Sequence, residues 1–337
     1  MPQSPDHTQS NAQSTLRSNV YRIPRRFNWT FVIGGFALVT FVLMAWRLGG
    51  SAFDSHAYLD TVRWLRGDLP QSALQAPFSY RLAVPALAAL LPGQAGNVFG
   101  LLNWLFVAAT ACLATAAVRR MGFGTQRALA AGMLVMLSLP VVWYAPTALV
   151  EPGSICMRML FVFAVLTAKP RLALGAALAA TAISEDNILL LGWLVATQRI
   201  GRTPGSVALV AALAWLGIVR WWIEADVPGT GWLPDPVAIA ARLGDWKGWL
   251  ALLGCAGLVV PLAMAGLRRA PPRIGDLKGL LLLMLVPALL GAVFGRLDGR
   301  LVWELYPFLL PFAVAVGMPR DVERQPDVRQ LRTARRA

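Results

Sequence analysis

The chain has 337 residues, of which 57% are hydrophobic and 14% charged, and its formal net charge is +14. Average soluble domains carry about 25% charged residues, so this composition excludes an ordinary water-soluble fold. The basic residues lie in short clusters between apolar runs rather than on one amphipathic face, and we therefore predict no nucleic-acid partner. Cys112, Cys156 and Cys255 all lie inside apolar runs, which excludes a disulfide framework or a zinc motif.

Most of the apolar residues lie in runs close to the length of about 20 residues that a helix needs to cross a bilayer. We therefore predict an all-α fold, a polytopic transmembrane helix bundle of about ten membrane helices that include one short hairpin. Residues 1–27 are expected to form a disordered cytoplasmic tail. Residues 28–319 are expected to form the bundle, with an outer loop helix at 53–69, and residues 320–337 a basic cytoplasmic tail.

The first apolar run follows three arginines and is too long for the core of a signal peptide, so we expect an uncleaved membrane helix. Leu82 to Leu91 are apolar but too few to span, and we expect them to dip into the outer leaflet or lie along it. The expected spans are residues 29–48, 97–118, 128–144, 153–168, 206–223, 249–267, 279–294 and 301–318.

Residues 172–183 and 188–197 are two apolar pieces separated by four polar residues, Ser184, Glu185, Asp186 and Asn187. One continuous helix would carry two carboxylates into hydrocarbon, which costs several kcal/mol for each. Two short antiparallel helices would instead place them at a turn that faces a polar cavity. We predict this hairpin.

Basic residues between the spans set the expected orientation. With both termini in the cytoplasm, most Lys and Arg residues lie on the cytoplasmic side, as the positive-inside rule requires. Most acidic residues then lie on or near the outer side, an asymmetry that membrane insertion does not demand. We therefore predict a working surface on the outer face.

Residues 53–69, FDSHAYLDTVRWLRGDL, have the pattern of an amphipathic helix directly after a membrane span. Helical periodicity places Asp54 and Tyr58 on one face, and His56 and Asp60 on the other. Asp54 then has two interpretations. It is an acid that caps the helix and complements its dipole, or it is a general base or metal ligand at the membrane surface.

Other charged residues also lie where charge is costly. Arg81, next to Tyr80, either extends to a lipid headgroup or recognises the phosphate of a lipid-linked ligand. Glu304 lies one turn into the last span and is expected to pair with Arg300 at spacing i, i+4. We interpret Glu151 and Arg158, two turns apart on one helix face, as a structural pair. The chain has no phosphate-binding glycine loop, HExxH motif or nucleophile elbow.

The outer loop carries a family resemblance. A basic N-terminus and one span are followed by Asp-x-x-x-Tyr and a downstream Gly-Asp, at Asp54, Tyr58, Gly67 and Asp68. This order resembles the start of GT-C type glycosyltransferases, integral membrane enzymes that use polyprenyl-phosphate sugars. The segments APFSYRLAVP, AISEDNILLL and GRLDGRLVWELYPFLLP are also similar to parts of uncharacterised bacterial multispan proteins.

The resemblance implies roles for specific residues. Asp54 would be the acidic residue of the first outer loop that acts as the catalytic base and deprotonates the acceptor hydroxyl, and outer-face arginines would hold the lipid phosphate. Many family members carry a second acid directly after the first, where this chain has Ser55. No cofactor is therefore predicted, and a divalent metal is the open alternative. The predicted substrate-binding residues are Tyr58, Tyr80, Arg81, Glu185, Asp186, Asn187, Arg296, Arg300 and Glu304.

The leading hypothesis is a membrane glycosyltransferase in the bacterial inner membrane. It would move a sugar from a polyprenyl-phosphate donor to an envelope acceptor on the outer face, by one inverting displacement. Its expected partners are membrane lipids and the polyprenyl-phosphate-linked sugar. One alternative is a transporter or flippase for a lipid or small solute, in which the hairpin is a broken-helix binding element. Another is a noncatalytic membrane component of a polysaccharide assembly system.

Overall fold

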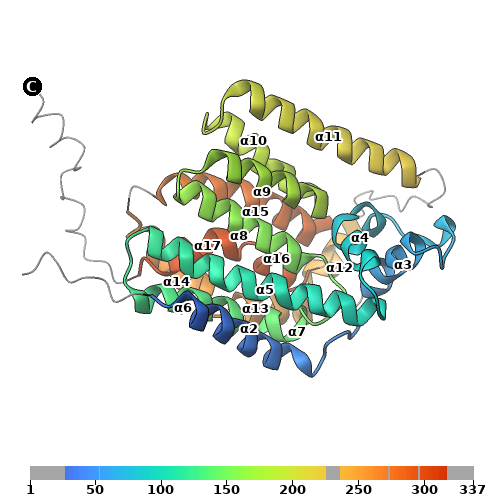
Figure 1. The fold of residues 1–337 in the computed structure, drawn as a ribbon, viewed down its shortest axis with the longest axis horizontal. Coiled ribbons are helices and arrows are strands. Elements are labelled where there is room, and N and C mark those ends of the chain that lie inside the picture. Colours follow the sequence, from blue (N-terminus) through green and yellow to red (C-terminus); the bar gives the residue numbers. More distant parts are fainter. Residues whose placement is uncertain (1–26, 53, 225–235, 272–273, 295–296, 317–337) are drawn as a thin grey trace, which may run out of the picture.

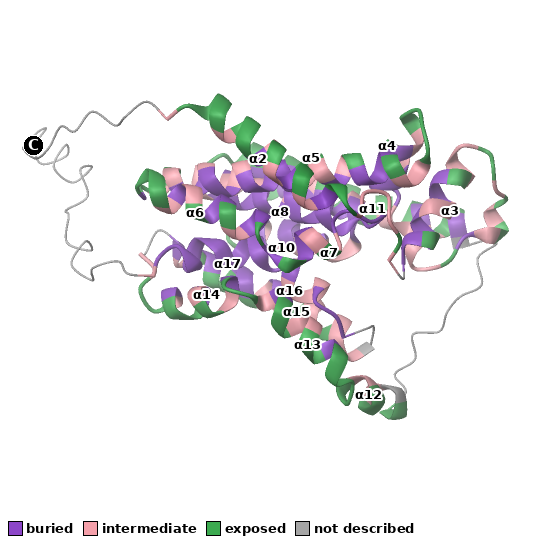
Figure 2. Ribbon diagram, turned by 90° about the horizontal axis from the view of Figure 1, so that it is seen from below, coloured by how far each residue is buried: buried purple, intermediate pink, exposed green. Residues whose placement is uncertain are grey.

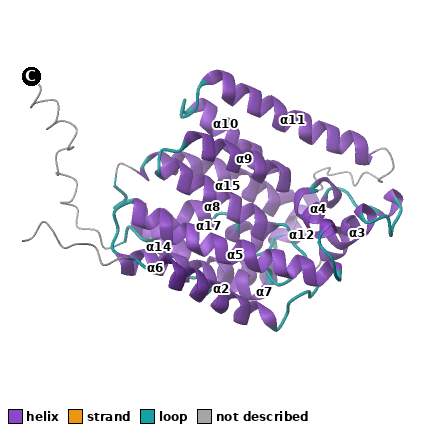
Figure 3. Ribbon diagram, viewed as in Figure 1, coloured by secondary structure: helices purple, strands orange, loops and turns teal. Residues whose placement is uncertain are grey.

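The computed structural model describes residues 27–52, 54–224, 236–271, 274–294 and 297–316. Within these ranges the chain is helical and contains no strand (Figure 3). The predicted all-α class is therefore confirmed. The two predicted tails fall outside the described residues, apart from Phe27.

The helices have the following bounds along the chain. Three short 3-10 turns lie between them: η1 (Gln71–Ala73), η2 (Phe78–Tyr80) and η3 (Glu185–Asn187). The α-helices are α2 (Trp29–Ala45), α3 (Ser55–Leu65), α4 (Ala83–Leu90), α5 (Ala95–Arg120), α6 (Thr125–Met136), α7 (Leu139–Trp143), α8 (Glu151–Leu166), α9 (Pro170–Ile183), α10 (Ile188–Ala196), α11 (Arg202–Glu224), α12 (Pro236–Leu243), α13 (Trp246–Ala256), α14 (Val259–Leu267), α15 (Asp276–Phe294), α16 (Arg300–Trp303) and α17 (Tyr306–Ala313).

Helix length and hydropathy give the chain the character of a membrane protein. Among the described residues, α5, α11 and α15 are long and apolar enough to cross a membrane. Helices α13 and α14 add a fourth candidate if they form one span with a bend of 65°. Helices α2 and α9 are apolar but have only 17 and 14 residues. The predicted number of about ten membrane helices is therefore not confirmed.

Three expected spans are each divided into two helices, α6 and α7, α13 and α14, and α16 and α17. The chain is extended at Ser138 (ψ 147°), immediately before α7, which has Pro140 in its first turn. Helix α13 ends at Ala256, and the following Gly257 has a φ of +46°, in the left-handed region. Pro307 lies in the first turn of α17 and has no N–H to extend a preceding helix. Apolar runs therefore predicted these helical regions but not the three breaks within them.

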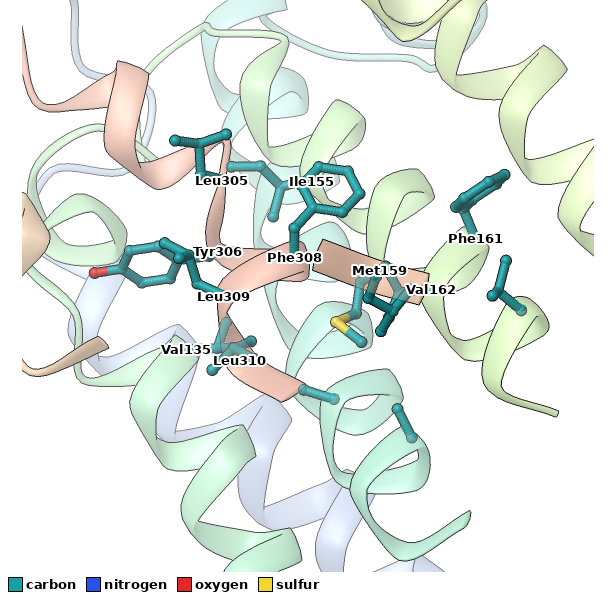
Figure 4. Close-up of a cluster of buried hydrophobic side chains, with 14 of the residues drawn as sticks. Val135, Ile155, Met159, Phe161, Val162, Leu305, Tyr306, Phe308, Leu309 and Leu310 are labelled. Carbon is teal, nitrogen blue, oxygen red and sulfur yellow. The ribbon is translucent and has the colours of Figure 1, made fainter. Parts of the chain in front are cut away.

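The interior of the bundle is built around α8 and α17, which are buried along most of their lengths (Figure 2). Figure 4 shows side chains of α8, among them Ile155 and Met159, beside Phe308 and Leu309 of α17. By contrast, large apolar side chains of α2, α11 and α15 are exposed, such as Phe31, which is 79% exposed. Such exposed apolar faces are compatible with contact to lipid.

Close packing of α14 on α17 depends on Gly266, because a Cβ atom there would clash with the carbonyl oxygen of Phe312. This neighbour is backbone and cannot rotate away. We expect Gly266→Ala to lower the free energy of unfolding by about 1–3 kcal/mol, measured as a lower unfolding temperature in detergent. Gly279→Ala in α15 is the control, because a Cβ atom there meets nothing within 4 Å. Equal losses in the two variants would contradict this explanation.

Helices α3 and α4 lie together at one end of the bundle, whereas α6 and α14 lie at the other (Figure 1). Arg66, which directly follows α3, fixes their contact. Its guanidinium donates to the carbonyl oxygens of Ala88, Leu91 and Gly93 at 3.0, 2.7 and 2.8 Å. These carbonyls lie at and after the end of α4, where backbone acceptors have no partner within a helix. Arg66 thus caps α4 and holds α3 against it.

Candidate functional site

Charged side chains from distant parts of the sequence lie close enough to interact, and Glu151 acts electrostatically on Tyr58, Arg81, Arg300 and Glu304. Three arginines form the centres of this cluster, and each binds one or more carboxylates. The arginines are Arg81, Arg158 and Arg300, and the carboxylates are those of Asp54, Glu151, Glu185, Asp186, Asp298 and Glu304. We refer to these residues together with Tyr58 as the charged cluster. Its carboxylates outnumber its guanidinium groups by two to one.

Arg300, the first residue of α16, binds three carboxylates. Its Nε atom donates to Asp298 at 2.8 Å, and its Nη1 atom donates to both Asp54 and Glu151. Asp298 also accepts a hydrogen bond from the backbone N–H of Arg300, which orients the loop before α16. Asp54 and Glu151 are therefore close neighbours, because they bind the same nitrogen atom.

Asp54 occupies the N-cap position of α3, but its side chain makes no capping hydrogen bond. Its carboxylate binds Arg300 instead, so the capping interpretation is wrong. The helix faces agree with the prediction: Asp54 and Tyr58 are buried, whereas His56 is exposed. Ser55 lies apart from this chemistry, because its hydroxyl accepts a hydrogen bond from the backbone N–H of Ala52.

Arg158 forms the most deeply buried centre of the cluster, with a side chain that is 1% exposed. Its guanidinium binds the carboxylate of Asp186, donates to Oδ1 of Asn187 at 2.6 Å, and donates to both the carbonyl and the carboxylate of Glu304 at 2.9 and 3.2 Å. Asn187 in turn donates to the Ser154 hydroxyl of α8 at 2.9 Å. Arg158 therefore joins α8, the turn η3 and the segment between α16 and α17.

The hairpin prediction is confirmed in its main feature. Helices α9 and α10 are separate, and Glu185, Asp186 and Asn187 form the turn η3 between them. Asn187 is fully buried, and its amide group also donates to the carbonyl oxygens of Ala180 and Ser184. The turn is thus held by hydrogen bonds within the protein.

Arg81 follows η2 and points to the same cluster, although it is bound less tightly than the other two arginines. Its Nη1 atom donates to the Tyr58 hydroxyl at 3.2 Å, and its Nε atom lies 3.4 Å from the carboxylate of Glu185. Its side chain remains 23% exposed. Burial raises the pKa of Tyr58 well above its usual value, so this phenol stays protonated at neutral pH.

Two further predicted residues are Tyr80 and Arg296. Tyr80 packs in an apolar cluster that contains Leu82 and Ile223, and the guanidinium carbon of Arg220 lies 5.2 Å from its ring centroid. Arg296 lies outside the described residues.

Two expected ion pairs are replaced by pairs between distant segments. Glu304 binds Arg158 rather than Arg300, and Glu151 binds Arg300 rather than Arg158. The expected partners were chosen from positions along one helix. In the structure, α16 ends before Glu304. Each of these four charged side chains pairs with a residue from another segment.

Sequence reasoning did not assign Glu151, Arg158 and Asp298 to the site. The available signal was the position of Arg158 in the middle of an apolar run, because an ionisable residue in such a run requires a buried partner. The identity of that partner does not follow from spacing, because Asp186 and Glu304 lie 28 and 146 residues away.

The cluster has no evident metal site. Among the described residues, no group of three or more His, Cys, Asp or Glu side chains is arranged to hold a metal ion. Each carboxylate of the cluster is instead within 4 Å of an arginine nitrogen.

No protein-family model matches the sequence, and no curated protein is significantly similar to it.

Proposed function

We propose that this protein is a membrane glycosyltransferase of GT-C type that uses a polyprenyl-phosphate sugar. The observation that supports this proposal best is the meeting of Asp54, Arg81, Glu185 and Glu304 in one charged cluster, although they come from four separate segments. Buried ionisable groups are costly in a membrane protein and occur mainly at functional sites. The cluster lies beside α3 and α4, the segments expected on the outer face.

The proposed reaction is a single inverting displacement. An acceptor hydroxyl oxygen attacks the anomeric carbon, the bond from that carbon to the phosphate oxygen breaks, and the polyprenyl phosphate leaves with the bonding electrons. Asp54 takes the hydroxyl proton. Arg300 holds the Asp54 carboxylate, and Asp298 holds Arg300, so the base has a fixed position.

Arg81 is the best candidate for binding the donor phosphate. Arg300 binds three carboxylates and Arg158 is almost completely buried, whereas Arg81 is partly exposed and makes two longer hydrogen bonds with described residues. A guanidinium group forms paired hydrogen bonds with phosphate oxygens and stabilises the charge that develops on the leaving group. The Tyr58 hydroxyl accepts from Arg81 and orients it towards the cluster.

Transport has less support than group transfer. A broken-helix transport site uses backbone groups that are free to bind the solute. Here the Asn187 side chain of η3 is engaged by Arg158, Ser154 and the end of α9, and the backbone carbonyl of Ser184 at the turn accepts from the Asn187 amide. The proposed location is the bacterial inner membrane, with both termini in the cytoplasm and about ten membrane-embedded helices, several of them too short to span.

The proposal is tested with purified protein in lipid nanodiscs, a radiolabelled polyprenyl-phosphate sugar and an envelope extract as the source of acceptor. Unmodified protein should release polyprenyl phosphate and label the acceptor. We expect Arg81→Gln to lower kcat/KM for the donor by about 100-fold, because charge stabilisation at the leaving group is lost. Arg63→Gln is the control, because Arg63 is 56% exposed and pairs with Asp60 on the same helix.

Transfer by unmodified protein with equal activity in both variants would exclude Arg81 from phosphate binding. Failure of the unmodified protein to use any polyprenyl-phosphate sugar would refute the proposed function.

A further inference from the structure

Glu151 has one carboxylate oxygen that the charged cluster leaves without a partner. It is the first residue of α8 and is 5% exposed. Its Oε1 atom accepts a hydrogen bond from Nη1 of Arg300 at 3.1 Å. Its Oε2 atom is buried and has no hydrogen-bond partner among the described residues. Buried polar atoms are nearly always paired, because an unpaired one is energetically costly.

The position of Glu151 is central to the proposed reaction. Glu151 shares the Nη1 atom of Arg300 with Asp54, the proposed base. Its charge also acts on Tyr58 and Arg81, the residues at the proposed phosphate site. Glu151 therefore lies close both to the proposed base and to the phosphate-binding arginine. The sugar of the donor would have to lie near these two groups.

The chemistry of the free atom restricts what it binds. A carboxylate oxygen accepts hydrogen bonds, and its negative charge repels a phosphate group. A sugar hydroxyl can donate one hydrogen bond to it. We propose that Oε2 of Glu151 accepts a hydrogen bond from a hydroxyl of the donor sugar, and that Glu151 is thereby a substrate-positioning residue. This inference rests on the proposed function, and it assigns the sugar to Glu151 and the phosphate to Arg81.

Asp298 provides a matched control. Like Glu151, it is a buried carboxylate bound to Arg300. Both of its oxygen atoms accept hydrogen bonds from Arg300, so it has no atom without a partner. Glu151→Gln and Asp298→Asn each remove one negative charge next to the same guanidinium. Only Glu151→Gln removes the unpaired acceptor.

The test compares two lipids in nanodiscs, undecaprenyl phosphate and undecaprenyl-phosphate glucose, by their dissociation constants for the unmodified protein and both variants. We expect Glu151→Gln to weaken binding of the glucose-linked lipid by about 10-fold and to leave binding of the bare phosphate lipid unchanged. Asp298→Asn should leave the ratio of the two constants unchanged. Glu151→Asp, which keeps the charge but withdraws the oxygen, should reproduce the selective loss and replaces Glu151→Gln if that variant does not fold.

Equal effects of the Glu151 variants on both lipids would overturn the inference, because Glu151 would then act only as a counter-ion of Arg300. The proposed function would survive that result, since the unmodified protein would still bind both lipids. If the unmodified protein bound neither lipid, both proposals would be overturned.

Discussion

Replacement of Asp54 by Asn is expected to lower sugar transfer from a polyprenyl-phosphate donor by about 100- to 10,000-fold, the range typical for loss of a general base. Asparagine has nearly the same shape, and its carbonyl oxygen still accepts a hydrogen bond from Arg300. It cannot, however, take a proton from the acceptor hydroxyl. The loss should therefore appear in kcat, whereas the affinity for the donor lipid should change little.

The matched control for this experiment is Asp60→Asn. Asp60 lies on the same helix and pairs with Arg63 at 3.2 Å, away from the charged cluster. We expect this variant to retain full activity. Undiminished turnover of folded Asp54→Asn protein would remove Asp54 from the mechanism, and equal losses in both variants would indicate a general effect on α3.

The second large effect is expected in stability. Replacement of Arg158 by Met should lower the free energy of unfolding by about 3–5 kcal/mol, because it leaves the carboxylates of Asp186 and Glu304 without their buried counter-charge. Methionine fills much of the same volume, so the loss of packing is small. Unfolding temperature in detergent measures this effect. The triple variant that also carries Asp186→Asn and Glu304→Gln should recover part of the loss, because the uncompensated charges are removed.

Arg199→Met is the control for the stability experiment. Arg199 also pairs with an aspartate, Asp276, but their side chains are 31% and 66% exposed. Exposed ion pairs contribute about 0–1 kcal/mol, so this variant should unfold close to the temperature of the unmodified protein. A similar temperature shift in both variants would mean that burial does not decide the strength of the Arg158 pairs.

Much of the fold follows from the sequence, because apolar runs predict helices wherever they occur. Helices α5, α8 and α15 lie close to their expected positions, and the polar residues Ser184 to Asn187 predict the break between α9 and α10. The breaks at Ser138 and Gly257 were not predicted. Apolar composition continues across both positions, and the turns are decided by backbone conformation and by packing against other helices.

The charged cluster was only partly predictable. Asp54, Arg81, Glu185 and Glu304 were predicted as site residues on four separate segments, and in the structure each of them binds a partner in the charged cluster. Their individual partners were not expected. Local spacing favours pairs within one helix, whereas the observed pairs Arg300–Asp54 and Arg158–Glu304 join residues 246 and 146 positions apart. Such contacts depend on the complete arrangement of the helices.

The partners of Arg158 also have a consequence for the order of biosynthesis. A chain is made from its N-terminus, so α8 emerges from the ribosome before any of the groups that neutralise its arginine. Asp186 follows after 28 residues, but Glu304 follows only after 146. Helices α8 to α10 can therefore pack together early, with Arg158 already paired with Asp186. Helices α16 and α17 are made later and bring Glu304 to Arg158.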